Sequence, residues 1–242
     1  MVNNALELTG VCKRFGGVQA VDGVNLQVAS DSVHGLIGPN GAGKTTLINL
    51  ISGLLVHSNG RIALNGDDIG NSQAHKRAQR GIARTFQNLR IYPNLTVQQN
   101  IEVAASTVSG HFSHKGSDRI EEAMSQFDLI DKRYLYASEL SYGHMRRLEI
   151  VRALALGPIV LMLDEPAAGM NQEETEQLID GLQWVKDNHT CAMLIIDHDL
   201  RFIMSVCDRI TVMNMGRVLI TGTPSEVSGD PAVIAAYLGE QE

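Results

Sequence analysis

The sequence has few cysteines and no long hydrophobic run. Its three cysteines, Cys12, Cys191 and Cys207, are an odd number without metal-ligand spacing, which is typical of reduced thiols. The longest apolar stretch covers residues 153–163, is broken by a Gly-Pro pair, and falls far short of the roughly 20 residues that span a bilayer. The first residues show no positive segment followed by an apolar run, so we expect a chain that stays in the cytoplasm.

A basic surface is lacking as well. The chain has 20 Lys and Arg against 27 Asp and Glu, a formal net charge of -7. This balance argues against a nucleic-acid partner and against attachment to anionic lipid by charge alone. Any association with a membrane should therefore go through protein partners. With 242 residues, 44% of them hydrophobic, the chain can bury a substantial core as one domain.

Short apolar runs alternate with helical patterns, which predicts an α/β core with a largely parallel, buried sheet. In the N-terminal stretch 6–28, glycine-containing turns at 16–17 and 22–23 separate short strands and indicate an antiparallel flap beside the core. The expected core elements are strands over 33–37, 82–86, 159–163 and 192–196 and a helix over 45–55.

Between residues 93 and 155 the pattern becomes helical, with a polar loop expected around residues 109–117. Apolar residues recur there at every third position, which predicts one face of a helix that begins near Ser141. These residues are Met145, Leu148, Val151 and Leu154. The stretch is therefore interpreted as a helical insertion.

A glycine-rich segment over 38–45 fits the phosphate-loop pattern GxxxxGK[ST] at every fixed position. It lies between an expected strand and an expected helix, which is the context that this motif requires. Its glycines let successive backbone N–H groups point at phosphate oxygens, and the helix N-terminus adds partial positive charge. The expected nucleotide-binding residues are Gly38, Pro39, Asn40, Gly41, Ala42, Gly43, Lys44, Thr45 and Thr46.

Individual roles follow from the chemistry of the side chains. Lys44 should reach the β and γ phosphates, the Thr45 hydroxyl should ligate Mg²⁺, and Thr46 should bond the α phosphate. The sequence thus predicts a site for ATP with Mg²⁺.

The apolar strand over 159–163 is followed by two carboxylates, Asp164 and Glu165. Ligands of α/β sheets bind at the carboxyl ends of strands, so both acids should face the phosphate loop. We expect Asp164 to hold the magnesium shell and Glu165 to polarise the attacking water. A solvated acidic turn would be the alternative, and the phosphate loop decides against it.

Further motifs occur in the order found in the ABC transporter ATPases, and the resemblance covers nearly the whole chain. The segment 140–144 reads LSYGH and resembles the family signature LSGGQ, with Tyr142 and His144 as departures. The resemblance implies that Ser141 and Gly143 of one subunit close over the γ-phosphate held by a second ATPase subunit, which is the same or a paralogous chain. It leaves open whether His144 is more than a solvated helix residue.

Three single residues take their expected roles from the same resemblance. Gln87 resembles the Q-loop glutamine, which touches the metal and passes motion to the helical insertion. His198 resembles the switch histidine that contacts the γ-phosphate, and Phe15 resembles the aromatic residue that stacks on adenine. Judged alone, Gln87 would be a solvated loop residue, His198 a structural histidine and Phe15 an aromatic residue packed against the core. The expected catalytic residues are Glu165, His198 and Gln87, and the expected metal ligands are Thr45, Gln87 and Asp164.

The segment 168–171 occupies the position of the family's D-loop, where Asn171 stands in place of the aspartate of many relatives. Asn171 and Glu174 also form a plausible helix capping box, so the role of Asn171 can be structural.

For the whole chain, the resemblance implies a P-loop NTPase (RecA-like) core with an N-terminal antiparallel β flap and an inserted helical subdomain. We expect a single ABC ATPase domain over 1–242, with core and flap at 1–92 and 156–242 and the helical signature subdomain at 93–155. The implied partners are transmembrane permease subunits, through which the ATPase sits peripherally on the inner face of the cell membrane, and indirectly a periplasmic substrate-binding protein.

The segments 83–88, 140–150 and 165–171 resemble those of the ATPases of branched-chain or hydrophobic amino-acid importers. Because such an ATPase carries no substrate pocket, the substrate follows only from this association. An ATPase of a lipopolysaccharide exporter is an alternative, since its relatives share the length and the Tyr-Leu-Gly ending at 237–239. A soluble ABC ATPase acting on DNA or ribosomes is another, disfavoured by the acidic balance and by the lack of coiled-coil arms, zinc modules or tandem ATPase domains.

Overall fold

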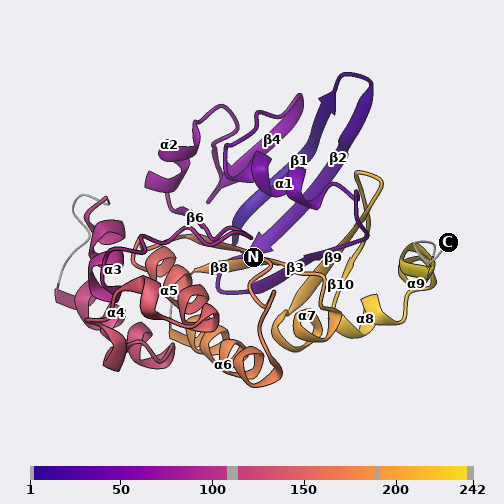
Figure 1. Cartoon of the computed structure of the whole chain (residues 1–242). Coiled ribbons are helices and arrows are strands. Elements are labelled where there is room, and N and C mark those ends of the chain that lie inside the picture. Colours follow the sequence, from indigo (N-terminus) through magenta and orange to yellow (C-terminus); the bar gives the residue numbers. More distant parts are fainter. Residues whose placement is uncertain (1–2, 108–113, 189–190, 239–242) are drawn as a thin grey trace.

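The computed structural model describes residues 3–107, 114–188 and 191–238 (Figure 1). Its central feature is a six-stranded sheet with the order β10-β9-β3-β8-β7-β6, in which all neighbours are parallel except the antiparallel edge strand β10. The strands are β3 (Val33–Ile37), β6 (Ile82–Arg84), β7 (Val160–Asp164), β8 (Ala192–Ile196), β9 (Arg209–Asn214) and β10 (Arg217–Gly222). The predicted α/β class with a parallel sheet is confirmed.

Every residue of β3, β7 and β8 is buried, which is why these strands are continuous apolar runs in the sequence. One face of the sheet packs against the C-terminal helices and the inserted helices, and the other packs against the flap and α1 (Lys44–Ile51). Two hydrophobic cores therefore lie on opposite faces of one sheet. The predicted ends of β3 and β8 are correct, whereas β6 is two residues shorter than predicted.

The flap is a four-stranded antiparallel sheet with the order β2-β1-β4-β5. Its strands are β1 (Asn4–Phe15), β2 (Val18–Ala29), β4 (Asn59–Leu64) and β5 (Asp67–Asp68). The predicted turn at Gly16 joins β1 to β2. The second predicted turn, at 22–23, is wrong: Gly23, with φ 63°, lies inside β2, where the pairing with β1 changes register. A bulge uses the same residue types as a turn, which explains the error.

Helix α1 lies between the two sheets and ends at Ile51, four residues before the predicted end. Its last carbonyls are capped by Arg77, a fully buried residue of α2 (Ala74–Gln79). The Arg77 guanidinium donates to the carbonyls of Leu50 and Ile51. A side chain from another element thus satisfies the helix end, and the chain is free to turn at Gly53.

The insertion consists of successive helices, namely α3 (Val97–Ser106), α4 (His114–Gln126), the short 3₁₀ turns η1 (Ile130–Lys132) and η2 (Ala137–Glu139), and α5 (Tyr142–Leu154). Helix α5 begins next to Ser141, as predicted, and Ser141 is its N-cap. The loop predicted over 109–117 lies outside the described residues up to 113, and its remainder is wrong because 114–117 form the start of α4.

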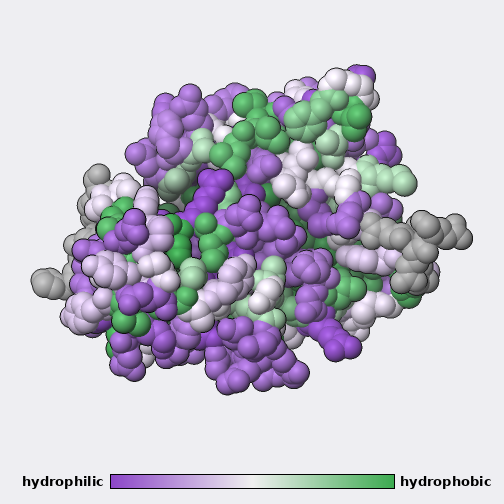
Figure 2. Space-filling view, in the orientation of Figure 1, coloured by the Kyte–Doolittle hydropathy of each residue, from purple (hydrophilic) through white to green (hydrophobic). Residues whose placement is uncertain are grey.

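The C-terminal part adds α6 (Gln172–Asn188), α7 (Leu200–Val206), α8 (Pro224–Ser228) and α9 (Pro231–Leu238). In Figure 1, α6 and α7 lie beneath the sheet beside α5, and α9 lies at the far end of the molecule. Within the ranges described above, no helix is both long and apolar enough to cross a membrane. Figure 2 shows a mostly hydrophilic face with apolar patches over the flap.

All three cysteines are free thiols. Cys191 and Cys207 are buried, and burial raises the pKa of each thiol to about 12. Both therefore stay protonated and unreactive near neutral pH. Cys12 is partly buried in β1.

A buried histidine makes the stability of the fold depend on pH. His34 in β3 is 2% exposed, its Nε2 lies 2.8 Å from Oγ1 of Thr211, and burial beside Arg209 lowers its pKa from 6.5 to about 4. Between these two values the unfolded chain binds a proton that the native chain does not. The free energy of unfolding should therefore fall as the pH drops from about 6.5 to about 4, by on the order of 3 kcal/mol.

Urea denaturation at pH 7.5 and pH 5 measures the larger part of this loss, about 2 kcal/mol. His34→Asn keeps a polar partner for Thr211 but does not titrate, so it should lose less stability over the same pH interval. His75→Gln, at an exposed histidine of α2, is the matched control and should behave like the parent. Equal losses in the parent and in His34→Asn would show that His34 does not carry the effect.

Candidate active site

A cleft of about 460 Å³ opens at the carboxyl edge of the six-stranded sheet. The phosphate loop follows β3, Asp164 ends β7, and Gln87 lies just beyond β6, so three parallel strands of one sheet deliver these groups to the same edge. The cleft is lined by Val18, Gln19, Ala20, Asn40, Gly41, Ala42, Gly43, Lys44, Thr45, Thr46, Gln87, Asp164, Glu165, Ile196, Met215 and Gly216. The structure thus brings together most of the predicted nucleotide, metal and catalytic residues.

Two positions of the phosphate loop must be glycine, because neighbouring backbone atoms leave no room for a Cβ. Gly38 has φ 146°, and a Cβ there would lie 2.0 Å from the carbonyl oxygen of Met213. Gly43, the N-cap of α1, has φ 101°, and its Cβ would lie 2.5 Å from the carbonyl oxygen of Ala20. Any larger residue would push the loop away from β9 and from the flap. The loop can curl around a phosphate only because both side chains are absent.

Lys44 lies inside the curve of this loop. Its ammonium donates hydrogen bonds to the carbonyls of Gly38 and Pro39, which directs the positive charge toward the loop interior. Thr45 and Thr46 occupy the first turn of α1 and line the cleft. Loop amides, helix N-terminus and ammonium together form an anion-binding site.

Asp164 is held by an arginine that the sequence reasoning did not assign to the site. Arg84 Nη2 lies 2.8 Å from Asp164 Oδ2, and the Arg84 side chain is only 7% exposed. The same guanidinium donates from Nη1 to Asn49 Oδ1 at 2.7 Å and to Ser52 Oγ at 3.1 Å, both near the end of α1. The pairing of β6 with β7 sets Arg84 opposite Met162 and so brings it near Asp164. A charged residue in the middle of the strand expected over 82–86 was the available signal.

The oxygen-bearing side chains of Thr45, Gln87 and Asp164 line one cleft. A hydroxyl, an amide and a carboxylate form a hard-oxygen donor set of the kind that Mg²⁺ prefers, and Mg²⁺ normally completes its shell with phosphate oxygens and water. Across the three described ranges, no cluster of three or more His, Cys, Asp or Glu side chains could hold a metal without such help. The donor set therefore fits a metal that arrives with a phosphate ligand.

Glu165 occupies a strained turn directly after β7. Its φ of 49° is in the left-handed region, which non-glycine residues rarely adopt. The turn is fixed by a hydrogen bond from the Glu165 N–H to the carbonyl of Ile196, at 2.7 Å. Strain of this kind persists only where the surroundings impose it, and it concentrates at functional sites.

His198 lies beside Glu165 but outside the lining of the cleft. Its Nδ1 is 4.0 Å from Glu165 Oε1 and 3.6 Å from Asp197 Oδ1, and its side chain is 73% exposed. Burial raises the pKa of Asp197, although hydrogen bonds from the backbone N–H groups of Asp199 and Ala167 oppose this shift. Asp197 therefore ties the loop after Glu165 to the end of β8.

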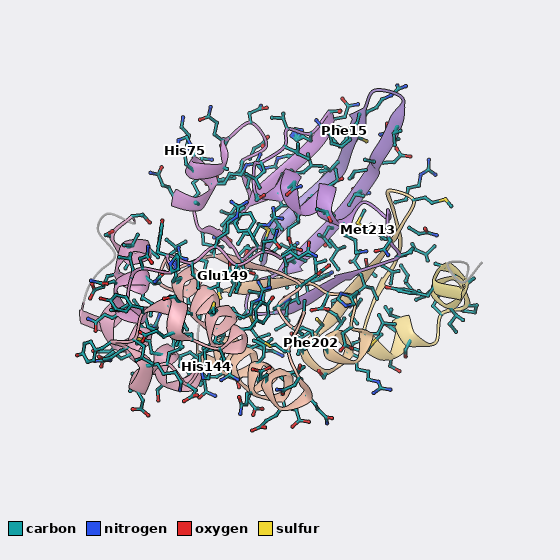
Figure 3. All side chains as sticks on the ribbon, in the orientation of Figure 1. Phe15, His75, His144, Glu149, Phe202 and Met213 are labelled. Atoms are coloured by element: carbon teal, nitrogen blue, oxygen red, sulfur yellow. The ribbon has the colours of Figure 1, made fainter. Side chains whose placement is uncertain are left out.

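Phe15 also lies outside the lining. It ends β1 (Figure 3), with 46% of its surface exposed. Lys13 Nζ lies 5.0 Å from the centre of its ring. The wall of the cleft on the flap side is formed instead by residues 18–20 of β2 and by Met215 and Gly216. Sequence reasoning missed this wall, since it depends on how two separate hairpins pack together.

The signature residues lie away from the cleft within the same chain. Ser141 is exposed at the N-terminus of α5, and Gly143 packs against Glu174 of α6 so closely that a Cβ would lie 2.5 Å from Glu174 Oε1. The capping box predicted for Asn171 is confirmed, with hydrogen bonds of 3.1 and 2.9 Å between Asn171 and Glu174. Figure 3 shows His144, on the same turn of α5, far from Phe15 on the flap.

The backbone around Gln87 is held by two buried charged residues of α5 that the sequence reasoning also missed. Arg146 donates to the carbonyls of Phe86 and Gln87 at 2.6 and 2.8 Å. Glu149, labelled in Figure 3, lies on α5. It accepts from the backbone N–H groups of Phe86 and Arg90, and pairs with Arg146 at 3.0 Å. Burial raises the pKa of Glu149 against the opposing effect of these hydrogen bonds. The Q-loop and the insertion are thus joined by direct contacts.

Comparisons with known proteins agree with this geometry. The ABC transporter family matches residues 21–168, and the family described as branched-chain amino acid ATP-binding cassette transporter matches residues 217–242. The high-affinity branched-chain amino acid transport ATP-binding protein BraF of Pseudomonas aeruginosa is 41% identical, over 97% of this chain and 98% of that protein. LivG of Escherichia coli K12, which has the same description, is 38% identical over the same shares.

A lipopolysaccharide export system ATP-binding protein, LptB of Haemophilus influenzae, is 35% identical over 98% of both chains. Among solved structures, the ADP conformation of MJ1267, an ATP-binding cassette of an ABC transporter, superposes with a TM-score of 0.86. That structure is 29% identical and covers 98% of this chain and 99% of its own.

The family match spans more than half of the chain, and relatives above 30% identity extend over nearly all of it, on a P-loop NTPase fold. This chain belongs to the ATP-hydrolysing, ATP-binding subunits of ABC transporters.

Proposed function

We propose that this subunit powers the uptake of branched-chain or other hydrophobic amino acids. The observation that carries the proposal is the near full-length identity of 41% and 38% to two ATP-binding proteins of branched-chain amino acid transport. The match of residues 217–242 to a branched-chain amino acid transporter family supports it independently. A role in lipopolysaccharide export is the second candidate, with relatives at 35% and 34% identity.

In the proposed reaction, the loop around Lys44 binds the phosphates of ATP, and Thr45, Gln87 and Asp164 hold Mg²⁺. Bound Mg²⁺ supplies positive charge that offsets the charge developing on the phosphate oxygens. Glu165 accepts a proton from the attacking water, and its rigid turn fixes the carboxylate for that task. His198, whose Nδ1 lies 4.0 Å from Glu165 Oε1, is proposed to contact the γ-phosphate. Phe15 is proposed to stack on the adenine through its exposed ring.

The position of the signature supports a shared site. Ser141 and Gly143 lie outside the cleft of their own chain, so their proposed contact with a γ-phosphate requires a second ATPase subunit, of the same or a paralogous chain. We propose that the core and flap, 1–92 and 156–242, and the helical signature subdomain, 93–155, are the two units that move against each other when ATP closes the dimer.

A groove of about 390 Å³ beside the Q-loop is our candidate for the permease contact. Its lining combines Arg84, Arg90 and Arg152 with aromatic rings, and Arg90 lies 3.7 Å from the centre of the Phe86 ring while Arg152 lies 5.0 Å from that of Tyr92. Arginine and aromatic residues dominate the energetics of protein interfaces. A permease segment seated there would contact residues that touch Glu149 and the Q-loop. The subunit would then sit peripherally on the inner face of the cell membrane.

The proposed transport function is tested with the complete transporter. The chain, purified with its permeases in nanodiscs, should hydrolyse ATP faster when a periplasmic binding protein loaded with leucine or valine is added. Gln87→Ala should bind ATP normally but lose most of this stimulation, because the Q-loop couples the two sites. The proposal would be contradicted if no amino-acid-loaded binding protein stimulated ATP hydrolysis and the chain assembled with lipopolysaccharide-export permeases instead.

The shared site is tested by trapping. Glu165→Gln removes the proton acceptor and should lower turnover by at least about 10²-fold. ATP with Mg²⁺ should then accumulate a dimer, measured by light scattering, since a ligand stabilises the state that binds it best. Adding Ser141→Arg should restore the monomer, and adding Lys44→Ala should abolish ATP binding itself. Dimer formation that survives Ser141→Arg would rule out the signature contact.

The permease contact is tested by charge reversal. Arg90→Glu should sharply reduce the amount of permease that co-purifies with the subunit, while ATP binding by the isolated chain stays normal. Arg209→Glu is the matched control, because Arg209 is exposed at the start of β9, which is separated from β6 by three other strands. Equal recovery of permease with both variants would exclude the groove as the docking site.

A further inference from the structure

Three side chains at the N-terminus of α5 form a continuous hydrogen-bonded chain. Ser141 Oγ lies 2.7 Å from His144 Nδ1, and His144 Nε2 lies 2.9 Å from Asp128 Oδ2. The His144 side chain is 23% exposed, so the histidine is not the solvated residue that the sequence allowed. Asp128 reaches it from the turn after α4, where its φ is 54°. The histidine is thus bound on both ring nitrogens.

The positions of the protons follow from the acceptors. A carboxylate can only accept, and hydrogen bonds from His144 and Lys132 lower the pKa of Asp128, so His144 Nε2 carries a hydrogen. In the neutral ring Nδ1 is then an acceptor. The Ser141 hydroxyl must donate to it, while Ser141 Oγ also accepts from the backbone N–H of His144 at 3.3 Å. With a neutral ring, the single hydroxyl proton of Ser141 therefore points toward His144 Nδ1.

A phosphate oxygen, in contrast, needs a donor. There are two ways for the Ser141 hydroxyl to donate its proton to a phosphate. Either His144 Nδ1 is left without a hydrogen-bond partner, or the His144 ring gains a second proton and Nδ1 donates to Ser141 Oγ. In the second case every group is satisfied, and the hydroxyl hydrogen is turned outward. The ring also brings a positive charge next to the residue that meets the anion.

We propose that His144 is a positioning residue which controls the donor direction of Ser141, so that protonation of His144 on closure turns the serine toward the γ-phosphate of the partner subunit. This inference rests on the shared ATP site proposed above and adds a proton-dependent step to it. The serine needs only the backbone N–H of His144 to cap α5, so the contacts of the ring with Ser141 and Asp128 are not explained by capping.

The charges around the ring are few. Asp128 faces Nε2 and is paired with Lys132 at 2.9 Å. Glu174 of α6 lies against Gly143, one residue away along the helix. Arg146 is directed to the Q-loop and Arg147 to Gln177 of α6, so neither is bonded to the ring. The carboxylate that is hydrogen-bonded to the ring is therefore Asp128, at Nε2.

The experiment measures the ATP-dependent dimer in the Glu165→Gln background between pH 5.5 and pH 9. The parent dimer should tighten by at least about fivefold from pH 8.5 to pH 6, the effect of gaining a well-formed hydrogen bond. His144→Gln should show only the weaker pH dependence that comes from ATP itself. His75→Gln, at an exposed histidine on α2 far from His144 in Figure 3, should follow the parent.

A second variant acts on His144 without replacing it. Asp128→Asn removes the charge that favours the protonated ring, and asparagine tolerates the left-handed backbone at this position. In this variant the midpoint of the pH dependence of dimer affinity should move to lower pH. Its melting temperature and its dimer affinity at low pH should change little. An unmoved midpoint, or a parent profile retained in His144→Gln, would overturn the inference. A dimer that persists in Ser141→Ala at every pH would instead overturn the shared site on which it rests.

Discussion

The buried pair of Arg146 and Glu149 is the contact on which the arrangement of the site depends. Burying two charges is costly unless each is paired and its remaining hydrogen-bonding groups are satisfied. Here the pair is completed by the backbone of the Q-loop, through the carbonyls of Phe86 and Gln87 and the N–H groups of Phe86 and Arg90. The loop cannot leave without stranding both charges. The conformation of the Q-loop and the position of the inserted helices therefore depend on each other.

This contact gives α5 two functions along its length. Its first turn presents Ser141, and its next turns hold the backbone that carries Gln87 into the cleft. Tyr142 links the two, because its hydroxyl accepts from Arg146 while its ring packs on Gly169. On the proposed shared site, a displacement of α5 toward the partner's ATP must also displace the Q-loop of its own cleft. Coupling between the two ATP sites needs an element whose position both sites influence, and α5 is such an element.

Sequence reasoning located what depends on local pattern and missed what depends on tertiary pairing. Buried parallel strands read as apolar runs, so β3 and β8 were predicted to the residue, and the phosphate loop followed from its glycines. The apolar residues at every third position of α5 gave no sign that Arg146, Arg147 and Glu149 are also buried. A charged side chain is predicted to be exposed as long as its partners are unknown. Arg84, Met215 and the flap wall depend on which strands and hairpins become neighbours.

His144 shows why a departure from a motif cannot be interpreted without its surroundings. A histidine in place of glutamine keeps a polar side chain at the same helical position, and either residue can accept from Ser141. Only the histidine can change from acceptor to donor at that nitrogen by gaining a proton. Asp128 makes the change possible, because it fixes the hydrogen on the other nitrogen and supplies the compensating charge. Since Asp128 comes from a left-handed turn 16 residues earlier in the chain, no local pattern around the signature predicts the pair.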